Sequence, residues 1–296
     1  MIDIKFPIPP GYNENPIWTG HDFKIGSDHV SVLHYSETLA GWNCDLTEFN
    51  EVKTYEGNHY LEKASRLHAC NEVKKWLPET GIVLEIGSSS GYFIRDLIHV
   101  LPNVSIIGSD CFPEALDNIS KKYKTPCLQF DLVNCPLPDS CVDVVVALNV
   151  LEHIDRDESA LYQIYRILKP GGYAVIEVPA NQDLYDFHDS ELKHFRRYDM
   201  SELVHKSEKN GFEIQIHSHL GFFVYPAFQA IKRRNKAKAP SSSPPQELIK
   251  RQAKNSFVFN ELFTILMHIE IFLQRVYIYP FGVRCLVTLK KPQLQS

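Results

Sequence analysis

One stretch of the chain is more informative than any other: Val83-Leu84-Glu85-Ile86-Gly87-Ser88-Ser89-Ser90-Gly91-Tyr92-Phe93. Its apolar beginning predicts a buried strand, and its Gly/Ser centre predicts a tight turn that opens a helix. Glycines at 87 and 91 let the backbone bend sharply and approach a ligand closely. The G-x-G-x-x-G fingerprint of dinucleotide sites does not fit, because Ser89 stands where its middle glycine belongs. The stretch alone therefore indicates either a ligand-binding turn or an ordinary turn between a strand and a helix.

Short apolar runs and helical patterns alternate on both sides of this stretch. Strands that alternate with helices of such length indicate right-handed βαβ units and a parallel sheet. The predicted fold class is therefore α/β, with a doubly wound, Rossmann-like, mostly parallel sheet of seven strands. Strands are expected at 82–86, 104–107, 127–130, 142–148, 173–178, 212–218 and 283–289, and helices at 60–77, 92–101, 113–122, 159–168, 200–210 and 257–277.

Acidic residues lie at the ends of three successive predicted strands. Glu85 lies in the first strand, Asp110 ends the second and Asp131 follows the third. A carboxylate at the second position can accept both hydroxyls of a ribose, and one at the third can accept from a purine amino group. Either aspartate could instead cap a helix. Because open α/β sheets bind ligands at the carboxyl ends of their strands, three carboxylates there favour a binding site.

Six segments, in this order, resemble the class I S-adenosylmethionine-dependent methyltransferases, particularly the bacterial group that includes small-molecule and glycan enzymes. The resemblance covers about residues 60–220 and resumes at Val283–Lys290, which resembles the antiparallel last strand of that fold. One departure is Ser89, where many members carry glycine; serine costs little there if its φ stays negative. The six segments are Val83–Phe93, Ile107–Asp110, Phe130–Leu132, Pro138–Asp143, Leu148–Ile154 and Leu168–Gly172.

The resemblance implies S-adenosyl-L-methionine as the cofactor. Asp110 would hold the ribose hydroxyls, and Asp131 with Leu132 would hold the adenine. Asn149 and Val150 would line the sulfonium side. The full set of cofactor-binding residues that the resemblance implies is Glu85, Gly87, Ser88, Gly91, Asp110, Asp131, Leu132, Asn149 and Val150.

The stretch Asp189–Tyr198 follows the fifth predicted strand, where this fold places its substrate loop. It resembles the H-x-R-R-Y stretch of bacterial methyltransferases thought to act on glycans or related metabolites. Arg196, Arg197 and Tyr198 are therefore expected to bind the acceptor, since an arginine fork suits a carboxylate or phosphate. The alternative is that these side chains tie the loop to the sheet through salt bridges.

A hydroxyl acceptor must also lose its proton, and two histidines are the candidate catalytic residues. His153, in Leu151-Glu152-His153 after the fourth strand, is the first candidate, because an imidazole accepts protons near neutral pH. His194 is the second. The alternative for His153 is a structural role, in which it hydrogen-bonds its loop or caps the next helix.

Composition and charge restrict the classes of function. The chain has 296 residues, of which 44% are hydrophobic, so it can bury a sizeable core without disulfides or a structural metal. A net charge of −5 argues against a general nucleic-acid binder. Seven scattered cysteines without a C-x-x-C pair favour a reducing cytoplasm, with no disulfide framework and no metal site. The N-terminus lacks the pattern of a signal peptide, and no apolar run is long enough to span a membrane.

The last third of the chain contains a basic strip beside an apolar helix. Residues 232–251 carry seven Lys/Arg and one acid, and the predicted helix 257–277 follows. Charged residues interrupt the helix, so it is expected to pack on the domain or roof the acceptor pocket. A sharper hypothesis is peripheral membrane contact through 232–277, since an apolar helix beside Lys/Arg docks on anionic lipid.

Together these interpretations predict four parts. They are an N-terminal cap segment (1–59), an S-adenosylmethionine-binding methyltransferase domain (60–220), a helical insertion (221–282) with a basic Pro/Ser-rich loop at 232–256, and a last strand with its tail (283–296). The expected activity is methyl transfer to a small organic acceptor, an oxygen of a metabolite, glycan or lipid-linked intermediate. The alternative is a non-catalytic S-adenosylmethionine-binding module that acts as a partner subunit.

Overall fold

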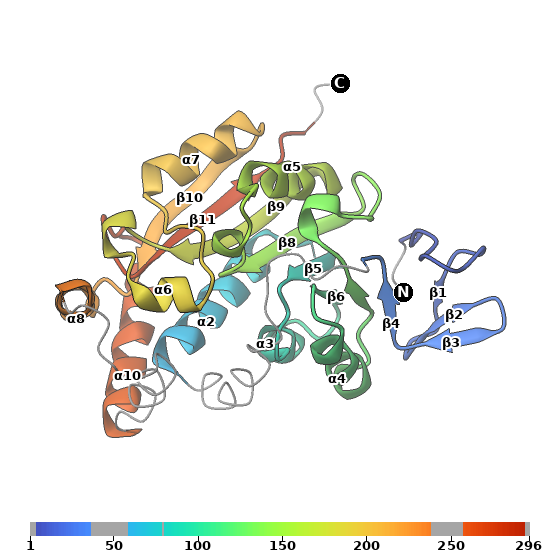
Figure 1. Ribbon diagram of the computed structural model, residues 1–296, viewed down its shortest axis with the longest axis horizontal. Coiled ribbons are helices and arrows are strands. Elements are labelled where there is room, and N and C mark those ends of the chain that lie inside the picture. Colours follow the sequence, from blue (N-terminus) through green and yellow to red (C-terminus); the bar gives the residue numbers. More distant parts are fainter. Residues whose placement is uncertain (1–3, 37–58, 79, 238–256, 294–296) are drawn as a thin grey trace.

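A computed structural model of the chain describes residues 4–36, 59–78, 80–237 and 257–293 (Figure 1). Its main sheet has eight strands in the order β10-β11-β9-β8-β5-β6-β7-β4. Neighbours from β9 to β4 pair in parallel, whereas β11 is antiparallel to both β9 and β10. The predicted α/β class with a mostly parallel sheet is confirmed. The strands are β4 (Val32–His34), β5 (Ile82–Ile86), β6 (Ser105–Asp110), β7 (Cys127–Gln129), β8 (Val142–Leu148), β9 (Leu168–Pro179), β10 (Glu213–Leu220) and β11 (Arg284–Lys290).

Helices cover both faces of this sheet. On one face, α2, α3 and α4 pack against the sheet in one hydrophobic cluster; on the other face, α5 and α7 pack in a second. The helices are α2 (Tyr60–Trp76), α3 (Tyr92–Val100), α4 (Pro113–Tyr123), α5 (Asp157–Ile167), α6 (Phe187–Glu191), α7 (Met200–Lys209), α8 (Tyr225–Ala237) and α10 (Phe257–Leu273), with short 3-10 turns η2 (Leu132–Asn134), η3 (Leu151–His153) and η4 (Gln182–Leu184).

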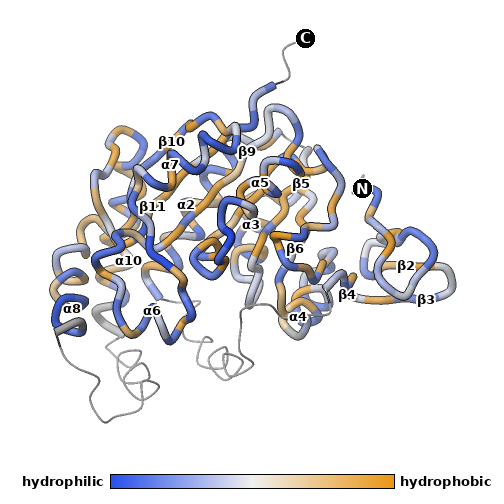
Figure 2. The backbone as a smooth tube through the Cα atoms, turned by 45° about the horizontal axis from the view of Figure 1, so that its top comes forward, coloured by the Kyte–Doolittle hydropathy of each residue, from blue (hydrophilic) through white to orange (hydrophobic). Residues whose placement is uncertain are grey.

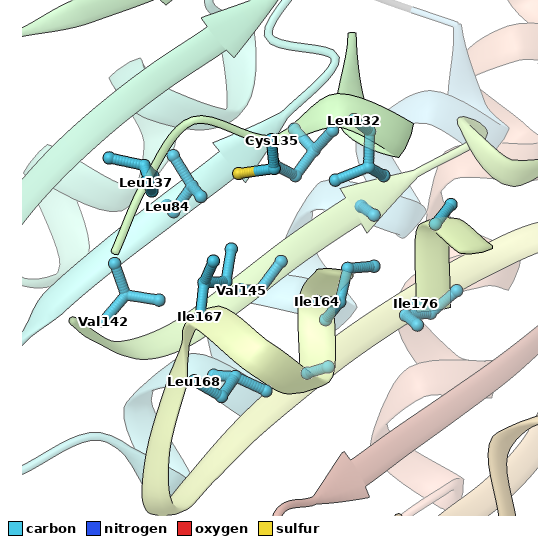
Figure 3. Close-up of a cluster of buried hydrophobic side chains, with 14 of the residues drawn as sticks. Leu84, Leu132, Cys135, Leu137, Val142, Val145, Ile164, Ile167, Leu168 and Ile176 are labelled. Atoms are coloured by element: carbon cyan, nitrogen blue, oxygen red, sulfur yellow. The ribbon is translucent and has the colours of Figure 1, made fainter. Parts of the chain in front are cut away.

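The central strands are buried on both faces, because successive side chains point to opposite sides of the sheet. In β5, Val83 joins the cluster under α3, whereas Leu84 joins the cluster under α5. Leu84 and Val145 lie on the same side of the sheet as Ile164 and Ile167 of α5 (Figure 3). Hydrophobic segments accordingly run through the middle of the molecule along the strands (Figure 2).

The expected number of seven strands is wrong by one, because the N-terminal segment contributes β4 to the edge of the sheet. Val32 and Leu33 of β4 are buried and pair with Cys127 and Leu128 of β7. Since β7 would otherwise be an exposed parallel edge, β4 covers its unpaired backbone groups. A run of three residues is too short to give a periodic signal. Beside it, β1 (Ile17–Trp18), β2 (Phe23–Ile25) and β3 (Asp28–Val30) form a separate small sheet (Figure 1).

Between β10 and β11 the described residues form two helices. The expected loop at 232–256 is wrong for its first residues, because 232–237 continue α8; its remainder, 238–256, lies outside the described residues. Helix α10 packs on α2 through Met267 and Ile271. In the described ranges, no helix combines the length and apolar composition that a membrane span requires. The proposed domain boundaries stay a prediction.

Candidate functional site

The turn after β5 has the backbone of a ligand-binding loop. Gly87 and Gly91 adopt φ of +75° and +71°, which glycine does without strain. Ser89 also has a positive φ, of 44°, so the condition under which serine costs little at this position is not met. A hydrogen bond compensates for the cost of this φ, because the Ser89 N–H donates to Oδ2 of Asp110 at 2.8 Å. The turn thus keeps a glycine-like shape with a serine in it.

Hydrogen bonds fix this turn to the neighbouring strand β6. The amides of Gly87 and Ser88 both donate to the Ser109 carbonyl, at 2.8 and 2.9 Å. The Ser88 hydroxyl accepts from the Ser109 N–H at 3.0 Å, and Ser88 is buried. Ser88, predicted to bind the cofactor, therefore holds the turn in place through its side chain.

Space at the turn is limited on the side of Val150. A Cβ placed on Gly87 would lie 2.7 Å from Cγ2 of Val150, which follows β8. The turn after β5 and the segment after β8 therefore meet, as expected for two predicted cofactor-binding segments. Glycine is required at 87 by its neighbour as well as by its φ.

The three predicted carboxylates lie at the carboxyl ends of three adjacent parallel strands, β5, β6 and β7. Burial raises the pKa of Glu85 well above its ordinary value, and the charge of Asp110 adds to the shift. Burial, then Asp110, and to a smaller extent Asp131, raise the pKa of the Cys111 thiol, so both aspartates are near enough to act on that thiol. Asp131 also caps η2 by accepting from the Val133 N–H at 3.1 Å. The same residue therefore caps a 3-10 turn and lies at the sheet edge that carries the other two carboxylates. We call residues 85–91 with Asp110 and Asp131 the cofactor edge.

Asn149 bends the chain after β8 with a φ of 54°. Its side chain donates to Oε1 of Glu177 at 2.9 Å, and its N–H donates to the Glu177 carbonyl at 2.8 Å. Glu177 is fully buried and paired with Arg284 of β11 at 2.5 Å. This ion pair is not evident from the sequence, because it joins residues from distant strands.

The two predicted catalytic histidines lie against each other. The rings of His153 and His194 meet edge to face, with centroids 4.6 Å apart. Glu152 precedes His153 in η3 and is 1% exposed, and its burial raises its pKa to about 8. The N–H of Phe195 donates to the Glu152 carbonyl at 2.8 Å and joins the two segments. We call Glu152, His153 and His194 the histidine cluster.

A buried ion-pair network orients His194. Its Nδ1 lies 3.1 Å from Oδ1 of Asp189, which also accepts from Arg197 at 2.8 Å. Lys232 of α8 pairs with Asp189 at 2.8 Å and with Asp186 at 2.6 Å. Burial alone would raise the pKa of Asp189, but hydrogen bonds from His194 and Arg197 hold it well below its ordinary range. An ionised Asp189 requires Nδ1 of His194 to donate, so the neutral ring carries its lone pair on Nε2.

The predicted acceptor-binding residues tie the loop to the domain. Arg197 is buried on Asp189, and the Tyr198 hydroxyl, also buried, donates to Asp157 at 2.8 Å. Arg196 pairs with Asp157 at 2.9 Å. These are the salt bridges of the alternative interpretation; a further role in acceptor binding stays a prediction.

Three residues of this region were not among the predicted site residues. Glu152 lies inside the quoted Leu151-Glu152-His153, but its burial could not be seen. Asp189 begins the quoted loop, and Lys232 belongs to the basic strip for which a contact with anionic lipid was the sharper hypothesis. A polar residue gives no sequence signal that separates a buried ion pair from a solvated surface.

Comparisons with known proteins show what the region that carries these residues is similar to. A family profile described as "Methyltransferase domain" matches residues 84–176. An uncharacterized methyltransferase-like protein of Schizosaccharomyces pombe is 37% identical over 134 residues, covering 43% of this chain and 52% of that protein. A protein of Mycolicibacterium smegmatis named "Probable S-adenosylmethionine-dependent methyltransferase" is 31% identical over 136 residues, covering 45% and 52%. The chain spans about half the length of these curated relatives.

The fold itself recurs in a solved complex between the Haloferax volcanii Trm112 methyltransferase activator and a candidate methyltransferase. A chain of that complex superposes with a TM-score of 0.55 at 17% identity, covering 85% of this chain and 97% of its own length. At this identity the likeness concerns the fold alone.

Proposed function

Residues 84–176 belong to a methyltransferase domain of the class I, S-adenosylmethionine-dependent type, and on this premise we propose that the protein transfers a methyl group to an oxygen of a small organic acceptor. The acceptor classes we propose are a metabolite, a glycan or a lipid-linked intermediate. The observation that carries the proposal is the cofactor edge, where a glycine-shaped turn beside Val150 lies at the same end of the sheet as three carboxylates.

The residues at this edge fit the cofactor. The space between Gly87 and Val150 is unfilled only because glycine has no Cβ. Among the described residues, Oε2 of Glu85 is buried and has no hydrogen-bond partner, so a donor from a ligand can satisfy it. Asp110 accepts from two backbone amides, those of Ser89 and Phe112, which hold its carboxylate at this edge, where a ribose would lie.

The chain's own contribution to the transfer is positioning and the removal of a proton. Bound S-adenosylmethionine supplies a methyl group already activated by its sulfonium. Holding an acceptor in line with that methyl removes much of the entropic barrier, up to ~7–11 kcal/mol in well-oriented reactions. We assign to His153 and His194 the removal of the acceptor's proton, because the two rings lie against each other and His153 follows β8 and Val150 in the chain.

Labelled methyl transfer tests the proposal. The full chain, supplied with methyl-labelled S-adenosylmethionine and fractionated metabolites and lipids of the source cell, should yield a labelled product. Asp110→Ala should weaken cofactor binding in calorimetry by about tenfold, or about 1.4 kcal/mol, whereas Asp139→Ala, at an exposed carboxylate, should not. Cofactor binding without product in any fraction would favour the alternative, a non-catalytic partner subunit.

We further propose that α10 and the end of α8 contact an anionic lipid surface. Five exposed apolar residues follow one face of α10 and the segment after it at helical spacing: Leu262, Ile265, Ile269, Phe272 and Val276. Arg233 and Arg234 of α8 and Arg275 after α10 are exposed cations that complement anionic headgroups. Co-sedimentation with phosphatidylserine-containing vesicles should exceed that with pure phosphatidylcholine, and Ile265→Glu should abolish it. Self-association through this face, measured by ultracentrifugation, would contradict the proposal.

The proposed compartment is the cytoplasm. All six cysteines that the structure describes are free thiols, and five of them are buried. Free buried thiols are typical of reducing compartments. Fractionation of the source cell tests this location, and a periplasmic or secreted pool would contradict it.

A further inference from the structure

Glu152 is a buried carboxyl group in need of a partner. It is 1% exposed, and neither of its carboxylate oxygens has a hydrogen-bond partner among the residues that the structure describes. Buried acidic groups in native proteins are normally hydrogen-bonded, paired with a cation or bound to a metal ion. A burial of this kind costs stability, so it points to a ligand at this place.

Two imidazoles stand beside that carboxyl group. Glu152, His153 and His194 each offer one ligand atom, and these atoms all lie within 4.8 Å of one another. One ion can therefore reach all three with only small side-chain movements. Two histidines and one carboxylate form the donor set of many catalytic zinc sites and suit other first-row divalent ions.

The orientation of His194 is the one that metal-binding histidines have. Its Nδ1 is engaged by Asp189, which leaves Nε2 toward the cluster as the atom that can bind an ion. In metal sites a carboxylate commonly holds the second ring nitrogen, fixing the tautomer and the ring plane. Arg197 and Lys232 hold Asp189 in turn, so the ring is fixed by a rigid layer.

We propose that Glu152, His153 and His194 bind a divalent first-row transition-metal ion, with Zn²⁺ as the first candidate. Mg²⁺ and Ca²⁺ prefer oxygen ligands and fit two imidazoles poorly. Three protein ligands leave at least one coordination position open, which is typical of catalytic rather than structural sites.

The place of the cluster gives the ion a role that rests on the proposed methyl transfer. The cluster follows Val150, which contacts the position of Gly87 in the cofactor edge. With the ion bound, the two imidazoles are ligands and no longer act as the base, and an acceptor hydroxyl at the open position would release its proton to water more readily. Its oxygen then forms the new O–C bond, the S–C bond of the cofactor breaks, and that electron pair stays on sulfur. The acceptor class would then be a hydroxyl compound that can bind a metal ion.

Calorimetric titration of Zn²⁺ into the untagged, chelator-treated full chain tests the site without any turnover. We expect one tight Zn²⁺ per chain and a rise in melting temperature on binding. Glu152→Gln keeps the size of the side chain and removes a charged ligand, and His194→Gln removes an imidazole. Each should weaken the tight event at least tenfold. His205→Gln, at an exposed histidine of α7, serves as the matched control and should bind like the unaltered chain.

Two results would overturn the site. One is the absence of a tight Zn²⁺ event in the unaltered chain; the other is equal affinity in Glu152→Gln and His205→Gln. Circular dichroism of each variant separates lost ligands from lost folding. If His194→Gln does not fold, Glu152→Gln alone decides, because it only exchanges one oxygen for an amide.

A second measurement separates this inference from the proposed function. Methyl transfer that continues at full rate after metal removal, and in Glu152→Gln, would leave the proposed function intact and remove the catalytic role of the ion. Tight Zn²⁺ binding with no labelled product from any fraction would support the site and contradict the proposed function.

Discussion

The cofactor edge and the histidine cluster lie beside each other in the fold, but they are built in different ways. Every residue of the cofactor edge lies at or just after its own strand, and the backbone does most of the shaping. The histidine cluster joins the end of β8 to a loop after β9, and Lys232 of α8 helps to hold that loop. Local sequence therefore specifies the first region, whereas distant ion pairs specify the second.

This difference predicts different sensitivities. Because the cofactor edge depends on positive φ and close approach, an added Cβ should harm it most. The histidine cluster depends on buried charges held by Arg197, Lys232 and Asp189, so removal of one charge should harm it most. The substitutions below, at four positions, test this contrast.

Lys232→Met should have the largest effect. Lys232 is buried and pairs with Asp186 and Asp189. Its removal leaves the buried Asp186 without its cation and Asp189 with Arg197 and His194 alone, and breaking a buried ion pair typically costs about 3–5 kcal/mol. Urea unfolding should report this loss, while the folded fraction keeps its affinity for S-adenosylmethionine, because the cofactor edge does not use Lys232.

Lys209→Met is the matched control for that experiment. Lys209 pairs with Glu158 on the surface at 2.6 Å, and both side chains are exposed. Such pairs contribute about 0–1 kcal/mol. Equal losses in the two variants would show that the network around Asp189 is no more than a surface salt bridge.

Gly87→Ala should have the next effect, on the opposite region. Its φ of +75° is strained for alanine, and its Cβ would lie 2.7 Å from Val150. We expect about 1–3 kcal/mol of lost stability and no measurable cofactor binding in calorimetry. Gly11→Ala is the control, since Gly11 has a similar φ of +85° but nothing within 4 Å; retained cofactor binding in Gly87→Ala would remove Gly87 from the cofactor site.

Much of the fold could be predicted from the sequence because the central strands are long and apolar. The boundaries of β5 (Ile82–Ile86) and β8 (Val142–Leu148) agree with the prediction residue for residue. Weak periodic signals gave the errors: β4 has three residues, and the strand expected from Tyr173 already begins at Leu168. A Lys-Pro-Gly-Gly stretch is typical of a turn, and here residues 169–172 form an irregularity inside β9, with Gly171 at a φ of +83° and a shift in the pairing with β8 between Leu168 and Tyr173.

The candidate site divides in the same way. The carboxylates of the cofactor edge could be predicted, because their place after a strand fixes where they lie. The environment of Arg197 could not, because an arginine in a loop is equally compatible with ligand binding and with a buried partner 8 residues earlier, Asp189. Only the tertiary packing decides between these two roles of the arginine, and the spacing of residues along the sequence does not predict that packing.

Glu85→Gln should change how stability depends on pH. Burial raises the pKa of Glu85 in the folded chain well above the 4.5 of an unperturbed glutamate. Above that ordinary pKa the unfolded chain releases the proton while the folded chain retains it, so stability falls as pH rises. Without cofactor, Glu85→Gln should therefore gain stability relative to the unaltered chain as the pH rises above that ordinary pKa in urea unfolding. Glu208→Gln, at an exposed residue of α7, should show no such trend; a gain in both variants would assign the effect to net charge.

Substitution of Ser89 should have the smallest effect and is the finest test of a backbone-built cofactor edge. Its φ of 44° costs a non-glycine residue about 1–2 kcal/mol of stability. Glycine avoids this cost, but it loses more conformational entropy on folding, which lowers stability by about 0.5–1 kcal/mol. These nearly cancel, so Ser89→Gly should keep stability within about 1 kcal/mol and leave cofactor affinity unchanged in calorimetry, since the N–H donated to Asp110 remains. Ser89→Val, whose branched side chain disfavours this φ, should lower both stability and cofactor affinity. Ser140, with a φ of 53° in an exposed turn, gives the control: Ser140→Val should lower stability alone. If Ser89→Val and Ser140→Val have the same cofactor affinity, the shape of this turn does not determine binding, because backbone strain at residue 89 would then lower only the stability of the fold.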